Sequence, residues 1–180
     1  MGSDIEAAAL ANAGEVLRAN GLDHTVTLRH QSQRGKIFAG VVTPGEQFTA
    51  TMCNPPFHAS AAEAARGSQR KWRNLGQADS ARPGTQGPTL NFGGQTAELW
   101  CTGGEASFVK RMIRESREIG AQVLWFSCLI SRSEHLSDIC KQLKKLGAEA
   151  VRTVPMAQGN KQSRFVAWSF LDIQKRTAGF

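Results

Sequence analysis

The chain has 180 residues, 41% of them apolar and 21% charged, which is ordinary for a soluble globular domain with a core of its own. No apolar run reaches the roughly 18 residues of a membrane-spanning helix, and Met1–Asp4 lacks the basic and apolar segments that begin a signal peptide. Lysine and arginine number 22 against 15 aspartates and glutamates, and this net charge of +7 favours a polyanionic partner such as RNA or DNA.

Helices are predicted where apolar residues recur every three or four positions, and strands where they alternate or run together. Glycines such as Gly21 and Gly147 end two of the helical patterns. In chain order the predicted elements are a helix over 6–20, strands over 25–28 and 48–52, a short helix over 59–66, a flexible loop over about 74–90, a helix over 104–119, a strand over 123–126, a helix over 136–146 and strands over 151–156 and 164–171.

Alternating strands and helices predict one α/β domain over residues 1–180, built on a mostly parallel sheet. Ligands of such sheets bind beyond the carboxyl ends of the strands. Asn54 directly follows a predicted strand, and 127–134, which follows another, is interpreted as a candidate lid. The four cysteines are widely spaced, so we expect buried reduced thiols, no metal site and a cytoplasmic protein.

The tetrapeptide Asn54-Pro55-Pro56-Phe57 carries the strongest functional pattern, and it has two interpretations. It can be a rigid turn, because prolines fix φ and remove backbone donors. It can also be a binding site for a planar amine, whose two N–H groups the Asn54 oxygen and the Pro55 carbonyl would accept. The nitrogen lone pair would then face an electrophile while Phe57 stacks on the substrate.

The motif belongs to a longer pattern that resembles the bacterial large-subunit (23S) ribosomal RNA adenine-N6 methyltransferases of the RlmF type. The similarity runs over nearly the whole chain, and several blocks keep their order and spacing. The blocks are Cys53 to His58, Leu90 to Gly94, Glu98 to Cys101 with Gly103 to Glu105, Met156 to Gly159, Lys161 to Phe165 and Ala167-Trp168.

The resemblance implies a class I S-adenosylmethionine-dependent methyltransferase with a Rossmann-like sheet, acting on 23S rRNA or a large-subunit assembly intermediate. It implies that Asn54, Pro55, Pro56 and Phe57 carry the chemistry on a flipped adenine. It places Asp4 and Asn54 at the cofactor, with the Asp4 carboxylate on the ribose hydroxyls. Asp4 has a second interpretation of equal weight, as the N-cap of the first helix.

Two basic groups are candidates for RNA contact. Arg66, Arg70, Lys71 and Arg73 surround Trp72 shortly after the motif, a pattern that suits phosphate contact and stacking, although a solvated helix end would look the same. Lys161 and Arg164 lie in the predicted turn between the last two strands, and we expect them to touch phosphate or to shape the adenine site.

The sequence departs from the family at its start, because no glycine-rich turn precedes Asp4. We therefore expect the chain to be the C-terminal portion of a methyltransferase domain, without the first strand and the glycine-rich loop. The cause would be a fragment, a misplaced start or a split protein. That first strand lies centrally in the fold, so we also expect an unpaired sheet edge and weak cofactor binding by this chain alone.

Two alternatives to rRNA methylation remain open at this point. A protein glutamine-amide N-methyltransferase would use the same motif geometry, although Phe57 in place of tyrosine and the charge of +7 disfavour it. A catalytically inactive RNA-binding fragment would also fit the missing front end.

Overall fold

The computed structural model describes residues 1–64, 99–158 and 161–180, with the side chains of 157–158 and 161–162 outside this description. The predicted loop over 74–90 lies outside the described residues. Residues 61–64 are helical. The other elements are β1 (Gly2–Asp4), α1 (Ala7–Ala19), β2 (Leu28–His30), β3 (Phe48–Ala50), α4 (Gly104–Glu118), β4 (Val123–Ile130), the 3₁₀ helix η1 (Ser133–His135), α5 (Leu136–Lys145), β5 (Ala150–Gln158), β6 (Lys161–Ser169) and α6 (Ile173–Ala178).

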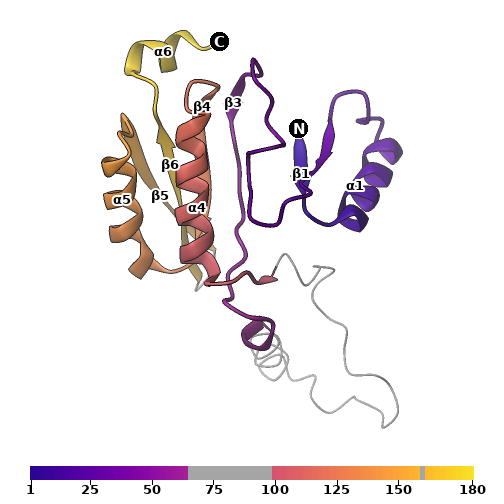
Figure 1. The fold of residues 1–180 in the computed structure, drawn as a ribbon, viewed down its shortest axis with the longest axis horizontal. Helices are drawn as coiled ribbons and strands as arrows, with labels where there is room; N and C mark the ends of the chain where they lie inside the picture. Colours follow the sequence, from indigo (N-terminus) through magenta and orange to yellow (C-terminus); the bar gives the residue numbers. More distant parts are fainter. Residues whose placement is uncertain (65–98, 159–160) are drawn as a thin grey trace.

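The strands form two separate sheets (Figure 1). β1 and β2 make a parallel pair beside α1, and the larger sheet has the order β3-β4-β6-β5. In the part of the chain that the structure describes, β1 bonds only to β2 and β3 only to β4, so each presents one unpaired edge. Unpaired sheet edges, as expected, are therefore present among the described residues.

The larger sheet is mixed, which corrects the prediction of a mostly parallel one. β3 and β4 are parallel, but β6 runs antiparallel to both β4 and β5. The reason is the length of the connection, because only two residues separate Gln158 from Lys161. A parallel crossover needs about a dozen residues or more, so these two strands can only form a hairpin.

The core lies between this sheet and the helices α4 and α5. Phe126 and Trp168 stack with ring centroids 5.8 Å apart, and both are fully buried. The Trp168 indole N–H donates to the Ser116 hydroxyl of α4 over 3.0 Å. Apolar side chains of α4 and α5 complete the cluster: Val109, Met112, Ile113, Ile139 and Leu143. The spacing of these helical residues is the periodicity from which both helices were predicted.

A buried carboxylate joins α4 to the segment between the two sheets. Glu115 is 6% exposed, and its Oε2 accepts the backbone N–H groups of Ile37, Phe38 and Ala39 over 2.9, 2.8 and 3.1 Å. Phe38 then packs edge-on against Phe126, with ring centroids 5.6 Å apart. Polar and apolar contacts therefore hold this irregular segment against the core.

Several element boundaries differ from the prediction. β4 continues to Ile130, four residues beyond the apolar run, so Ser127–Ile130 is strand and the interpretation of 127–134 as a lid is wrong there. β2 begins at Leu28, where the predicted strand ends. α6 was not predicted. It is a short helix of six residues capped by Asp172, whose side chain accepts the Lys175 N–H.

We expect the ion pair between Arg29 and Glu46 to stabilise the fold only above acidic pH. The Arg29 guanidinium, followed by the Thr43 backbone N–H, lowers the pKa of Glu46 from its ordinary 4.5 to about 2. Because the folded-state pKa is depressed, the contribution is complete above pH 4.5 and is lost as the pH falls towards 2. Thermal melts should show the wild type above Glu46→Gln at neutral pH, with the gap closing in acid. A gap that is constant with pH would contradict this.

Candidate functional site

The motif begins directly after the last backbone hydrogen bond between β4 and the segment that follows β3. Backbone hydrogen bonds continue past Ala50, with Thr51 N–H donating to Trp125, Ser127 N–H to Thr51 and Leu129 N–H to Cys53, over 2.9, 3.0 and 2.9 Å. Asn54 is the next residue. It therefore lies at the carboxyl end of a strand that is parallel to β4, at the edge where ligands of such sheets bind.

Burial separates the members of the tetrapeptide. Pro55 and Pro56 are buried, Phe57 is half-buried and the Asn54 side chain is exposed. The prolines thus anchor the turn inside the protein and leave the amide of Asn54 facing outward. The exposed Asn54 is therefore not a packing group, and its role in binding an amine stays a prediction.

The segment after the motif is held by the chain that leads into α4. His58 N–H donates to the Leu99 carbonyl and Cys101 N–H donates to the His58 carbonyl, each over 3.1 Å. Gly104, the first residue of α4, lies against the backbone of His58 and Ala59. A Cβ on Gly104 would come within 3.3 Å of the Ala59 nitrogen, closer than ordinary van der Waals contact.

Replacing Gly104 by alanine should destabilise the protein by about 1–3 kcal/mol, because Gly104 has a φ of +61° and its Cβ would press on the turn. Gly147→Ala is the matched control, since Gly147 has a φ of +76° and nothing lies within 4 Å of its added Cβ. The free energy of unfolding in urea measures both. Equal losses would show that contact with the turn has no effect.

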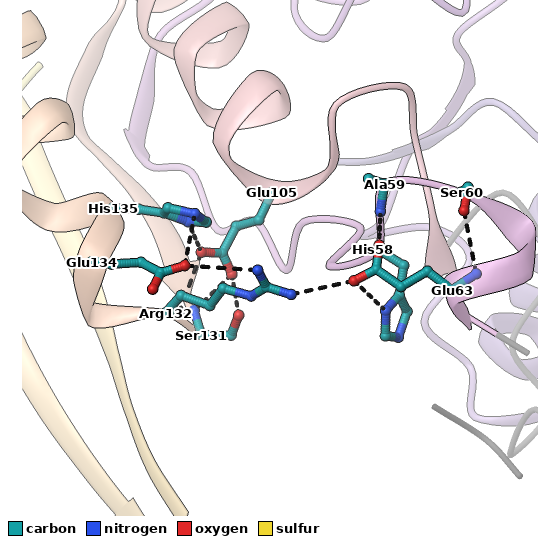
Figure 2. A network of polar contacts seen from close by, with 9 residues as sticks. All are labelled: His58, Ala59, Ser60, Glu63, Glu105, Ser131, Arg132, Glu134 and His135. Atoms are coloured by element: carbon teal, nitrogen blue, oxygen red, sulfur yellow. Dashed lines mark hydrogen bonds and ion pairs between the residues drawn. The ribbon is translucent and has the colours of Figure 1, made fainter. Parts of the chain in front are cut away.

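A buried carboxylate organises the backbone that follows β4 (Figure 2). Glu105 accepts Ser131 N–H over 2.8 Å, the Ser131 hydroxyl, and Arg132 N–H over 3.4 Å, and its Oε1 lies 2.7 Å from His135 Nδ1. Burial by itself raises the pKa of the Glu105 carboxyl. The hydrogen bonds from the Ser131 hydroxyl and amide and from His135 outweigh burial, so the pKa lies below its usual range.

A second carboxylate, Glu63, connects this loop to the motif. Its Oε2 accepts Ala59 N–H over 2.8 Å, and its Oε1 lies 3.3 Å from Arg132 Nη2 and 3.9 Å from His58 Nδ1. The Ala59 amide is the largest influence and lowers the pKa of Glu63. Burial opposes this, and His58 and Arg132 lower the pKa further, so Glu63 is held as a carboxylate.

Arg164 is brought to the same end of the sheet as Asn54. It is half-buried and pairs in register with Ile130 on β4 and with Pro155 on β5. Ile130 is the residue directly before Ser131. Lys161 opens β6 opposite Gln158, and its side chain lies outside the description. Arg66, Arg70, Lys71 and Arg73 fall among the residues that the structure does not describe, so their predicted RNA contact stays a prediction.

Asp4 ends β1, and its Oδ1 accepts the Glu6 N–H over 2.7 Å. The N-cap of α1 is Glu6, which makes no side-chain cap hydrogen bond, so the interpretation of Asp4 as the N-cap is wrong. The bond from Glu6 N–H to Asp4 closes a local turn before the helix. It uses one carboxylate oxygen, and the half-buried side chain retains a second. The interpretation of Asp4 as a ligand of the cofactor ribose stays a prediction.

Two further observations concern only the part of the chain that is described. No group of three or more potential metal-ligating side chains occurs there. Nor is any helix of those residues long and apolar enough to cross a membrane. The four cysteines are free thiols, with Cys128 buried and the other three half-buried.

The polar network around Glu105 was missed in the sequence. No sequence pattern points to a role for His135, and Glu105 belongs only to one of the blocks that resemble the family. An acidic residue in the first turn of a helix is common, because it favours the positive end of the helix dipole. Nothing in the local pattern distinguishes such a residue from one buried against a loop 26 positions away.

Comparisons with known proteins match almost the whole chain. A family model described as RNA methyltransferase matches residues 1–172. Ribosomal RNA large subunit methyltransferase F of Pseudomonas putida (strain KT2440) is 54% identical over 178 residues, which are 99% of this chain and 55% of that protein. The protein of the same name from Pseudomonas savastanoi pv. phaseolicola is 52% identical over 177 residues, 98% of this chain and 53% of its own length. The chain thus spans about half the length of these relatives.

A solved structure agrees with the fold. The hMettl16 catalytic domain in complex with MAT2A 3'UTR hairpin 1 matches with a TM-score of 0.72 and 25% identity, over 95% of this chain and 55% of that one. The predicted fold class is confirmed as the mixed α/β fold of class I S-adenosylmethionine-dependent methyltransferases. The chain, similar over its length to about half of each of these relatives, therefore belongs to the RNA methyltransferase family.

Proposed function

We propose that this chain provides the adenine-binding part of an enzyme that methylates the N6 amine of one adenine in 23S rRNA, with S-adenosyl-L-methionine as the methyl donor. The exposed Asn54 amide, anchored by two buried prolines at the carboxyl end of β3, is the observation that carries this proposal. The names of the relatives support an rRNA substrate. The RNA hairpin in complex with the hMettl16 catalytic domain supports recognition of structured RNA.

The chemistry asked of the motif is orientation rather than strong base catalysis. An exocyclic amine is a weak nucleophile because its lone pair is delocalised into the purine ring. The Asn54 oxygen and the Pro55 carbonyl accept its two hydrogens, which increases electron density on nitrogen and points the lone pair away from the ring plane. Phe57 stacks on the base and holds it outside the RNA helix.

The residues present fit the proposed cofactor at one position. Asp4 ends β1 and has a second carboxylate oxygen outside its bond to Glu6, and we propose that this oxygen accepts the ribose hydroxyls. When bound, S-adenosyl-L-methionine supplies an electrophilic methyl group. The task of Asn54 beside it is to keep the acceptor nitrogen in line with that group, which lowers the entropic part of the barrier.

Charge supports RNA as the partner. The excess of 22 basic over 15 acidic residues favours phosphate, and Arg164 lies at the Asn54 end of the sheet. Arg164 is therefore our candidate for a phosphate contact beside the flipped adenine. The Arg66–Arg73 cluster remains a second candidate for the same RNA, at a place that the structure does not describe.

The decisive experiment is nucleoside mass spectrometry of rRNA from a strain that lacks this gene. We expect one N6-methyladenine to disappear from 23S rRNA and to return with the wild-type gene, but not with Asn54→Ala. Intact rRNA methylation with loss of a methylated glutamine in a protein would replace the proposal with amide methylation. No change in either would indicate a module that only binds RNA.

A further inference from the structure

The loop after β4 and the motif after β3 lie side by side at one sheet edge. Leu129 N–H donates to the Cys53 carbonyl over 2.9 Å, so Asn54 and Ile130 come next on neighbouring parallel strands. Ser131 then leaves the sheet into the loop Ser131–His135. A residue that fixes the Ser131–His135 loop therefore also fixes the backbone that lies next to Asn54.

Glu105 is the group that fixes the loop. Its side chain is 1% exposed, and its two oxygens take up two backbone N–H groups, a hydroxyl and an imidazole nitrogen from Ser131, Arg132 and His135 (Figure 2). A carboxylate buried to this degree is unfavourable unless hydrogen bonds satisfy it. Every donor to Glu105 comes from the loop, so the loop and the carboxylate hold each other in place.

Two routes lead from Glu105 to the motif. Through the chain, its neighbour Gly104 lies against the backbone of His58 and Ala59. Through side chains, Arg132 reaches Glu63 over 3.3 Å, and Glu63 holds Ala59 N–H over 2.8 Å. Together the two routes connect Glu105 to His58 and Ala59, the residues that follow the Asn54–Phe57 motif.

We infer that Glu105 is a positioning residue, which sets the place of the Asn54–His58 turn relative to the edge of β4. It does so through the Ser131–His135 loop and the Arg132–Glu63 contact. Its consequence for methyl transfer rests on the proposed function, whereas the mechanical link between Glu105 and the turn does not. The reason for such a device is that a misplacement of about 1 Å in a reacting geometry lowers the rate by about a hundredfold.

Glu105→Gln tests this on the full chain, because it replaces one acceptor oxygen with an amide donor that faces other donors. Glu115→Gln is the matched control. It lies ten residues further along α4, about 15 Å at the helical rise, and it too is a buried carboxylate that accepts backbone N–H groups. Both variants should lose stability, so stability alone cannot distinguish positioning from packing.

Hydrogen exchange of single amides provides that distinction. In Glu105→Gln we expect the amides of Ser131, His58 and Ala59 to exchange about tenfold faster or more. In Glu115→Gln we expect faster exchange at Ile37, Phe38 and Ala39 instead, with His58 and Ala59 unchanged. Unchanged exchange at His58 and Ala59 in a folded Glu105→Gln protein would overturn the inference.

Arg132→Met gives a second, milder variant. It keeps the aliphatic stem but removes the contact with Glu63, so Ala59 should exchange faster while Ser131, still bonded to Glu105, does not. If Glu105→Gln does not fold, unchanged Ala59 exchange in Arg132→Met overturns the inference by itself.

Turnover separates this inference from the proposed function. With 23S rRNA as substrate, Glu105→Gln should lower kcat about tenfold to a hundredfold and change KM for RNA less than about twofold. Exchange effects as expected, together with unchanged rRNA methylation in a strain that lacks this gene, would remove the proposed function and leave the positioning link. Methyl transfer by the wild type without those effects would do the reverse.

Discussion

Asn54→Ala should reduce methyl transfer to rRNA about a hundredfold to a thousandfold, as expected when a polar group that acts on the reacting atom is removed. The loss should appear in kcat and not in the free energy of unfolding. The Asn54 side chain is exposed, and the turn is held by the buried Pro55 and Pro56 and by backbone bonds at His58. Single-turnover methylation of 23S rRNA measures the first quantity and urea denaturation the second.

Two variants make this prediction specific. Asn54→Asp keeps an acceptor oxygen at the same position and should retain more activity than alanine. Met52→Ala lies two residues upstream with a side chain that is 92% exposed, and it should leave turnover unchanged. An Asn54→Ala protein within about twofold of wild-type turnover would show that the amide does not hold the acceptor nitrogen.

The fold was largely predictable because periodicity and connection length are local properties of the sequence. The stripes on α4 and α5 and the apolar start of β4 gave these elements correctly. The antiparallel direction of β6 was also available, since the seven residues between the predicted strands 151–156 and 164–171 leave no room for a crossover. The extension of β4 to Ile130 was not available, because Ser127 and Cys128 do not mark a strand by themselves.

The candidate site was predictable only in part, because its members come from separate elements. Asn54 could be placed at a strand end, because alternating apolar residues over 48–52 predict a strand and the prolines end it. The contact between Glu105 and Ser131 depends on how α4 packs against β4, a tertiary fact that no local pattern contains. The register that brings Arg164 beside Ile130 was likewise fixed by sheet pairing and not by the turn in which the sequence placed it.

Trp168→Ala should lower the free energy of unfolding by about 3–5 kcal/mol, the largest stability effect that we expect from one side chain. Trp168 is fully buried, stacks on Phe126 and donates its indole N–H to Ser116, so the change removes a large apolar volume between β6 and α4. The urea midpoint should fall, and the unchanged m-value would show that the same folded unit unfolds. Val151→Ala is the control. It lies opposite Trp168 on β5 but is 37% exposed, and it should change stability by less than about 1 kcal/mol.

The hydrogen bond of Trp168 can be separated from its volume by a double-mutant cycle with Ser116. Trp168→Phe keeps most of the ring, and Ser116→Ala leaves the indole N–H buried without a partner, which should destabilise the protein by about 1–3 kcal/mol. In the Trp168→Phe background the same serine change should matter much less, because no donor is left unsatisfied. Equal losses in the two backgrounds would mean that the bond over 3.0 Å contributes nothing and that packing alone holds β6 to α4.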